Sequence, residues 1–143
     1  MPSTTCPLCA PSSQDLLWHD NFCRVILVDD PAYPAFCRVI LNAHIKEMTD
    51  LPEQDRQRLM SVVFATEAAV REVVQPDKIN LASLGNMVPH LHWHVIPRFA
   101  GDPHFPDAIW AEAKRDGVVK ADAELRPRLL EALRRRLGPP AAG

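Results

Sequence analysis

Three histidines stand at alternate positions in the segment HLHWHVIPR, residues 90–98. Side chains alternate between the two faces of an extended strand, so His90, His92 and His94 would share one face. A row of imidazoles makes poor core, because every buried ring nitrogen needs a hydrogen-bonding or metal partner. The segment therefore predicts a polar ligand, a metal ion or water against this face.

One metal ion is not expected to bind all three rings. Same-face neighbours on a strand lie about 6.6 Å apart, and the outer pair about 13 Å apart. Zinc holds its ligand atoms only about 2.0–2.3 Å away, so adjacent rings can converge on one ion, whereas the outer two hardly can. We therefore expect the three histidines to have different tasks.

Two cysteines near the N-terminus, Cys6 and Cys9, have the C-x-x-C spacing of a zinc knuckle. The pattern alone is compatible with a zinc site, a redox pair or coincidence, although no βαβ pattern surrounds it to favour a thioredoxin-like role. Two cysteines provide half of a tetrahedral site, so two histidines would have to complete it. Cys23 and Cys37 lie in apolar runs and are expected to be small buried residues.

Two polar loops contain candidate binding groups. Asn86 follows Gly85, whose conformational freedom lets the backbone pass close to a ligand. Asn86 could donate to a phosphate oxygen or could bond to its own backbone in a turn. Asp29 and Asp30, in the stiff loop DDPAYPA, could accept from ribose hydroxyls or could be solvated loop acids.

The elements that position these groups alternate between short apolar runs and helical periodicity. The predicted strands are residues 23–28, 36–41, 79–83 and 90–98. The predicted helices are residues 52–74, 106–116 and 122–137. Strands paired through turns, with helices on one side, predict an α+β fold around an antiparallel sheet. Arg98, at the end of the histidine strand, could face a distal phosphate, but we expect it to be an exposed arginine.

The composition is that of one soluble domain, with 47% hydrophobic and 24% charged residues among 143. A formal charge of −2 gives no footprint for nucleic acid, although small phosphates remain possible ligands. The chain contains no apolar run of about 18 residues and begins without a signal-peptide pattern, so we expect a cytoplasmic protein with no membrane partner. We expect a knuckle loop at 1–15, a core at 16–100 and a helical extension at 101–143.

At this point the residues resemble a known family. The segment HLHWHVI, residues 90–96, resembles the signature of the histidine-triad (HIT) family, and the D-x-P-x-x-P loop followed by CRVILNAH resembles the segment preceding it. The CPLC segment resembles the knuckle of zinc-containing members of bacterial type. The resemblance covers about residues 6–100 and implies a HIT-like fold, usually a homodimer.

The resemblance also implies roles for individual residues. His92 would attack the α-phosphorus of a nucleotide derivative and form a covalent nucleotidyl-histidine, which water then releases. His94 would stabilise the phosphate or the leaving oxygen. Asn80 and Asn86 match positions that contact substrate. The implied substrate is a purine nucleotide derivative, such as a dinucleoside polyphosphate or a nucleoside phosphoramidate.

The same resemblance supplies the missing metal ligands. In zinc-containing members, two histidines join the cysteines at positions matched here by His44 and His90. It thus implies one structural zinc per chain, held by Cys6, Cys9, His44 and His90, with no position left for water.

Two residues depart from the family pattern and leave other functions open. Phe36 stands where many members have a histidine, and Met87 stands where some have a hydroxyl residue. Arg38 or a backbone group would have to replace the missing histidine. One alternative function is a nucleotide-binding regulator with little turnover. The other is a zinc-handling protein whose triad binds metal.

Overall fold

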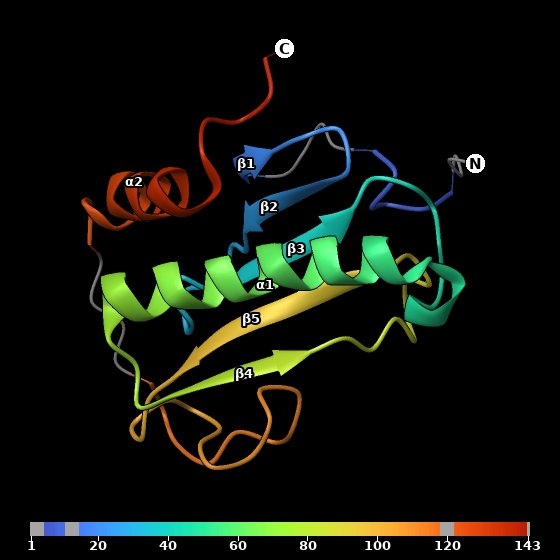
Figure 1. The fold of residues 1–143 in the computed structure, drawn as a ribbon. Coiled ribbons are helices and arrows are strands. Elements are labelled where there is room, and N and C mark those ends of the chain that lie inside the picture. Colours follow the sequence, from blue (N-terminus) through green and yellow to red (C-terminus); the bar gives the residue numbers. More distant parts are fainter. Residues whose placement is uncertain (1–4, 11–14, 118–121, 143) are drawn as a thin grey trace.

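The centre of the protein is a five-stranded antiparallel sheet with the strand order β1-β2-β3-β5-β4 (Figure 1). A computed structural model describes residues 5–10, 15–117 and 122–142. The strands are β1 (Asp15–His19), β2 (Cys23–Leu27), β3 (Cys37–Leu41), β4 (Lys78–Ala82) and β5 (His92–Arg98). The helices are α1 (Glu53–Val74), α2 (Leu125–Leu137) and a short 3₁₀ helix, Met48–Asp50. The predicted α+β fold is confirmed.

Helix α1 confirms the helix predicted from Pro52. Pro52 caps the helix with an extended backbone, and the acidic Glu53 and Asp55 lie in the first turn beside the positive helix end. The helix ends at Gln75, whose φ of 48° is left-handed, and Pro76 follows. Its buried side chains repeat at helical spacing: Leu59, Val62, Val63, Thr66, Ala69, Val70 and Val73.

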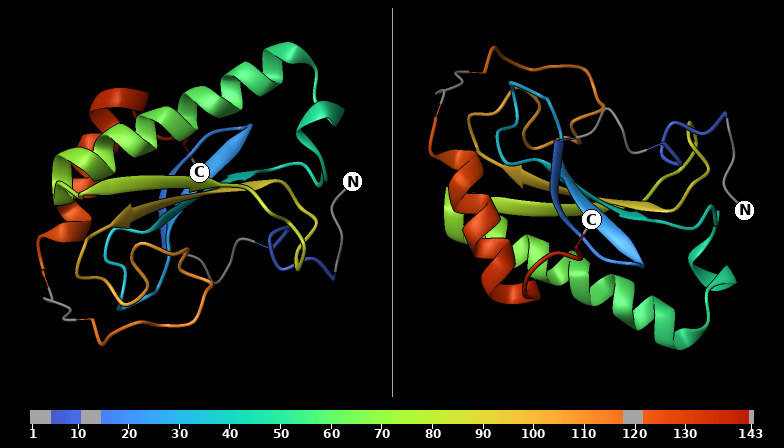
Figure 2. Two further views of the ribbon diagram at one scale, coloured as in Figure 1. Left: turned by 90° about the horizontal axis from the view of Figure 1, so that it is seen from below. Right: turned by 90° about the horizontal axis from the view of Figure 1, so that it is seen from above.

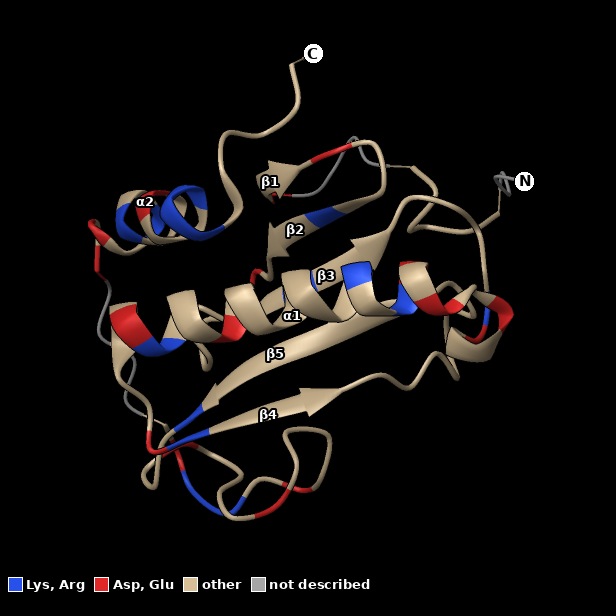
Figure 3. Cartoon of the chain, in the orientation of Figure 1, with Lys and Arg blue, Asp and Glu red and all other residues tan. Residues whose placement is uncertain are grey.

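The two faces of the sheet have different coverings. Helices α1 and α2 cover one face, whereas residues 5–10 and residues 99–117 lie on the other (Figure 2). Most charged residues lie on the helices and in the loops, with few on the strands (Figure 3). Among the described residues, we find no helix with the length and apolar character to cross a membrane.

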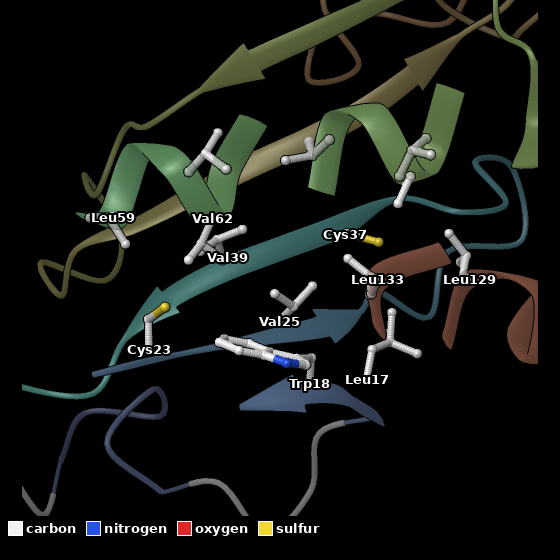
Figure 4. Packing of buried hydrophobic residues seen from close by; sticks show 14 of the residues in the cluster. Leu17, Trp18, Cys23, Val25, Cys37, Val39, Leu59, Val62, Leu129 and Leu133 are labelled. Carbon is white, nitrogen blue, oxygen red and sulfur yellow. The ribbon is translucent and has the colours of Figure 1, made fainter. Parts of the chain in front are cut away.

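The apolar core lies between the sheet and the two helices (Figure 4). Val25, Val39 and Val95 point to this face from three neighbouring strands and are completely buried. Leu129 and Leu133 of α2 pack into the same cluster. Burial of each such side chain contributes about 1.5–3 kcal/mol to the stability of the fold. Because these residues must face the helices, the strand residues between them face the opposite side of the sheet.

Strand β1 is an element that the sequence did not predict. Its register with β2 shifts between Leu16 and Trp18, and the neighbours Leu17 and Trp18 are both buried in the core cluster. This irregularity removes the strict alternation by which strands are recognised in a sequence. The indole Nε1 of Trp18 donates to the carbonyl oxygen of Gly138 at 3.1 Å, which joins the strand to the C-terminal segment.

The helix predicted for residues 106–116 is wrong, because this segment is an irregular loop. The backbone N–H groups of Lys114 and Arg115 both donate to the carbonyl oxygen of Pro103, and the Arg115 guanidinium donates to the carbonyl oxygen of Asp102. These partners lie outside the segment, so they replace the local bonds of a helix. The terminal helix was predicted from residue 122 and begins instead at Leu125.

Arg98 was predicted to be exposed, and this prediction is also wrong. Arg98 is only 2% exposed, and it donates from Nε and Nη2 to the two carboxylate oxygens of Asp102 at 2.9 and 3.1 Å. Its Nη1 donates to Asn80 Oδ1 at 2.7 Å. The Asp102 carboxylate also accepts from the backbone N–H groups of Phe99, His104 and Phe105. The ion pair therefore anchors the start of the 99–117 loop to the sheet.

Replacing Asp102 with asparagine should lower the free energy of unfolding by about 3–5 kcal/mol at pH 7, because Arg98 stays buried without its counter-charge. Burial alone would raise the pKa of Asp102, but the Arg98 guanidinium and the backbone donors hold it well below its usual range. The stabilisation is therefore full at neutral pH and is lost as the pH falls below about 4. Urea unfolding should show that the difference in the free energy of unfolding between the wild type and Asp102→Asn is about 1 kcal/mol smaller at pH 3 than at pH 7.

Asp107→Asn is the matched control for this comparison. Asp107 lies in the same loop and forms an exposed ion pair with Lys114 at 3.1 Å. An exposed pair contributes about 0–1 kcal/mol, so this variant should unfold nearly as the wild type does. If Asp102→Asn lowers the free energy of unfolding by the same amount at both pH values, the ion pair of Asp102 with Arg98 is not the source of the stabilisation.

Candidate active site and metal centre

Strand β5 presents His92 and His94 on the face of the sheet that the helices leave uncovered. In the pairing with β3, His92 lies opposite Ile40 and His94 opposite Arg38. The two imidazoles meet edge to face, with ring centroids 5.0 Å apart and an interplanar angle of 82°. Both residues are buried, at 8% and 5% exposure, yet both line a cavity.

The hydrogen bond of His92 defines its tautomer. Its Nδ1 lies 2.6 Å from the carbonyl oxygen of His90, and a carbonyl only accepts, so Nδ1–H is the donor. Burial lowers the pKa of His92, and the nearby charge of Arg38 lowers it further, although the bond to His90 acts in the opposite direction. The ring is therefore neutral at pH 7, with the lone pair on Nε2, which is the form of imidazole that can act as a nucleophile.

His94 is held as a neutral hydrogen-bond donor. Arg38 Nε donates to His94 Nδ1 at 3.3 Å, so the proton of the neutral ring is on Nε2. Burial, the adjacent His92 and the Arg38 cation lower the pKa of His94 to about 4. The positive charge of the site therefore comes from Arg38 and not from His94.

Arg38 is a site residue whose importance the sequence only partly indicated. It lies in the apolar run FCRVIL, where it was named only as one possible replacement for the histidine that Phe36 lacks. Phe36 itself packs against His94, with ring centroids 5.8 Å apart. Strand register identifies Arg38 as a site residue, because the pairing of β3 with β5 places Arg38 opposite His94. This pairing is visible in the structure and not in the sequence.

Two adjoining cavities open at this face. The first, of about 360 Å³, is lined by both histidines, Trp110 and residues 84–88. The second, of about 640 Å³, lies along the end of β2 and includes residues 26–29. Leu8, Arg38 and Val88 line both cavities, so a ligand at the histidines can extend from one into the other.

Of the four residues predicted to contact substrate, two line the cavities and two do not. Asn86 lines the histidine cavity, and Asp29 lines the adjoining one. Asp30 lines neither, and its Oδ1 instead accepts from the backbone N–H of Ala32 at 3.0 Å. Asn80 is on the same face of the sheet, but it is bonded to Arg98 and lines neither cavity.

Four predicted metal ligands converge beside the start of β5. The ligand atoms of Cys6, Cys9, His44 and His90 all lie within 4.8 Å of one another. His90 Nδ1 is 3.5 Å from Cys6 Sγ, 3.4 Å from Cys9 Sγ and 3.2 Å from His44 Nδ1. Tetrahedral zinc with sulfur and nitrogen ligands requires separations of about 3.3–3.8 Å, so these side chains could hold a zinc ion.

The surroundings orient the same four ligands. His90 Nε2 donates to the carbonyl oxygen of Leu41 at 2.6 Å, which leaves Nδ1 unprotonated toward the cysteines. The His90 segment is joined to the His44 segment because Leu91 N–H donates to the carbonyl oxygen of Ile45 at 2.8 Å. His90 lies just before β5, which begins at His92 and not at residue 90 as predicted.

Comparison with known proteins gives the site a context. The family description of the HIT domain matches residues 11–101. A curated AP-4-A phosphorylase of Mycobacterium tuberculosis is 27% identical over 81 residues, which are 52% of this chain and 42% of that protein. A protein of Arabidopsis thaliana named adenylylsulfatase HINT3 is 28% identical over 127 residues, which are 85% of this chain and 61% of that protein. The chain thus spans less than two thirds of either relative.

Solved structures resemble the chain over most of its length. A histidine triad protein from Marinobacter aquaeolei VT8 has a TM-score of 0.72 and 31% identity, covering 87% of this chain and 92% of that one. A zinc-bound histidine triad family protein from Mycobacterium smegmatis has a TM-score of 0.63 and 25% identity, covering 92% and 94%.

Proposed function

The chain belongs to the HIT domain family, and from that premise we propose that it is a nucleotidyl hydrolase or transferase. It cleaves at the α-phosphate of a purine nucleotide derivative through a covalent intermediate on His92. The observation that carries the proposal is the bond from His92 Nδ1 to the His90 carbonyl at 2.6 Å, which leaves a lone pair on Nε2 of a residue that lines the cavity. The two relatives with enzyme names, an AP-4-A phosphorylase and an adenylylsulfatase, support the same substrate class.

The reaction takes place in two displacements. In the first, Nε2 of His92 attacks phosphorus, an N–P bond forms, and the bond from phosphorus to the leaving group breaks with its electron pair leaving on that group. In the second, a water oxygen attacks phosphorus, the N–P bond breaks, the electron pair returns to Nε2, and the proton from the water passes to solvent. The Nε2–H of His94 donates to a phosphoryl or leaving-group oxygen, and Arg38 balances the phosphoryl charge.

The adjoining cavity is the proposed place of the nucleoside. Its volume of about 640 Å³ is sufficient for a nucleoside, and it meets the histidine cavity at Arg38. In the adjoining cavity, Asp29 accepts hydrogen bonds from ribose hydroxyls. In the histidine cavity, Asn86 donates to a phosphate oxygen. In this arrangement Asp30 and Asn80 support the loop and the Arg98 pair and do not touch the substrate.

His92→Asn should abolish turnover while retaining nucleotide binding, because asparagine cannot form the phosphoryl bond. We expect kcat/KM for diadenosine tetraphosphate and adenosine phosphoramidate to fall by about a thousandfold or more. AMP release measured by chromatography, with mass spectrometry of acid-quenched wild-type protein, checks both turnover and the adenylyl adduct.

His19→Asn is the control, because His19 is a half-buried histidine on β1 that lines neither cavity. Its kcat/KM should stay within about twofold of the wild type, as for a substitution away from the site. AMP binding to the wild type without any adduct or turnover would refute the enzyme and favour a nucleotide-binding regulator.

We further propose that Cys6, Cys9, His44 and His90 hold one structural zinc ion per chain. Four protein ligands leave no open position, so the ion supplies folding energy and holds the chain in place without activating water. His90 carries the carbonyl that orients His92, so loss of the ion should also loosen the nucleophile. A zinc-handling function would instead require a second ion that depends on His92 and His94.

Cys9→Ser should remove most of the bound zinc and lower the free energy of unfolding by about 3 kcal/mol or more, because bound metal stabilises only the folded state. Elemental analysis of protein purified without chelators, together with urea unfolding, tests this. Cys37→Ala is the control, since Cys37 is fully buried in the apolar core, and this variant should keep one zinc per chain. Wild-type protein with no zinc would contradict the site, and a second ion that is lost in His92→Asn would favour the zinc-handling function.

A further inference from the structure

Exposed apolar side chains gather around the histidine cavity. Leu84, Met87 and Trp110 are 56%, 94% and 52% exposed, and all three line that cavity. The other large apolar side chains with comparable exposure among the described residues, Leu16 and Phe64, line neither cavity. Leu16 and Phe64 stand singly, whereas three exposed apolar side chains around one cavity are typical of a surface that a ligand covers.

Trp110 is fixed in its position at the site. Its indole meets the His94 ring edge to face, with centroids 5.1 Å apart and an interplanar angle of 66°. The loop that carries it is anchored at one end by the Arg98–Asp102 pair and at the other by Arg115, which donates to the carbonyl oxygens of Asp102 and Phe105. The long irregular loop therefore holds an aromatic wall against the catalytic strand.

The charges around this cavity do not suit a long polyphosphate. Each additional phosphate in a leaving group adds negative charge that needs cationic or N–H partners. Among the described residues that line the histidine cavity, Arg38 is the only lysine or arginine, and it is already bonded to His94. The remaining wall at Leu84, Met87 and Trp110 offers apolar contact instead.

We propose that the leaving group of the substrate is apolar, preferably aromatic, and that Trp110, Leu84 and Met87 form its subsite. This inference rests on the proposed function and narrows its substrate class to nucleotides whose α-phosphate is joined to an amine or alcohol that carries an aromatic ring. For an amine, attack by His92 Nε2 breaks the P–N bond, and the amine departs with the electron pair and takes a proton from solvent. Water then releases AMP, so the balance is phosphoramidate plus water giving amine plus AMP.

Three adenosine phosphoramidates with the same reacting bond test the subsite. Their amines are an arylethylamine, ethanolamine and phosphoethanolamine, which differ only beyond the two-carbon chain. We expect the kcat/KM of the wild type to be at least about tenfold higher for the arylethyl compound than for ethanolamine, and lowest for phosphoethanolamine. In Trp110→Ala the arylethyl preference should fall toward unity, and in Trp110→Phe most of it should return.

Phe64→Ala is the matched control, because Phe64 is a similarly exposed aromatic residue, at 55%, on α1. This variant should keep the full preference. A wild-type preference for the phosphoethanolamine compound, or a Trp110→Ala variant that loses the same factor on all three substrates, would overturn the subsite while leaving the proposed reaction in place. Absence of AMP release from all three compounds and of any His92 adduct would overturn the proposed function itself.

Discussion

The hydrogen bond from His92 Nδ1 to the carbonyl oxygen of His90 determines what the site can do. It sets the tautomer of His92, directs the ring and leaves Nε2 with a lone pair. His90 has a second task, because its own ring points into the Cys/His cluster and its Nε2 donates to Leu41. His90 thus joins the candidate metal ligands, β3 and His92, so a change in the position of one of them affects the other two.

The electrostatic character of the site follows from the buried sheet face. Burial keeps His92 and His94 neutral, and Arg38 supplies the cation beside them. Further along the same strand, Arg98 is neutralised by Asp102 and serves to anchor a loop. The two arginines on this face therefore differ in their roles. Arg98 has a carboxylate partner and anchors a loop, whereas Arg38 has its charge at the cavity.

The main outline of the fold could be predicted from the sequence where patterns are local. Helix α1 and four strands show regular periodicity, and Pro52 and Pro76 mark the helix ends. The four ligands that the family resemblance indicated do lie together, within 4.8 Å. The roles of His92, His94, Asn86 and Asp29 stay predictions.

The failures of prediction have tertiary causes. The helix predicted for residues 106–116 was wrong because Pro103 and Arg115 offer the loop other hydrogen bonds. Arg98 was expected to be exposed because its partners, Asp102 and Asn80, are not recognisable as partners from the sequence. Arg38 acquired importance only through strand register, which depends on how distant segments pair.

The most direct measurement is the protonation of the His92 ring, read by nitrogen-15 NMR of zinc-loaded full-length protein at pH 7. Long-range proton–nitrogen correlations should show a protonated Nδ1 and an unprotonated Nε2, in a neutral ring. A proton on Nε2, alone or together with one on Nδ1, would contradict the account, because the nitrogen that faces phosphorus would have no lone pair to donate.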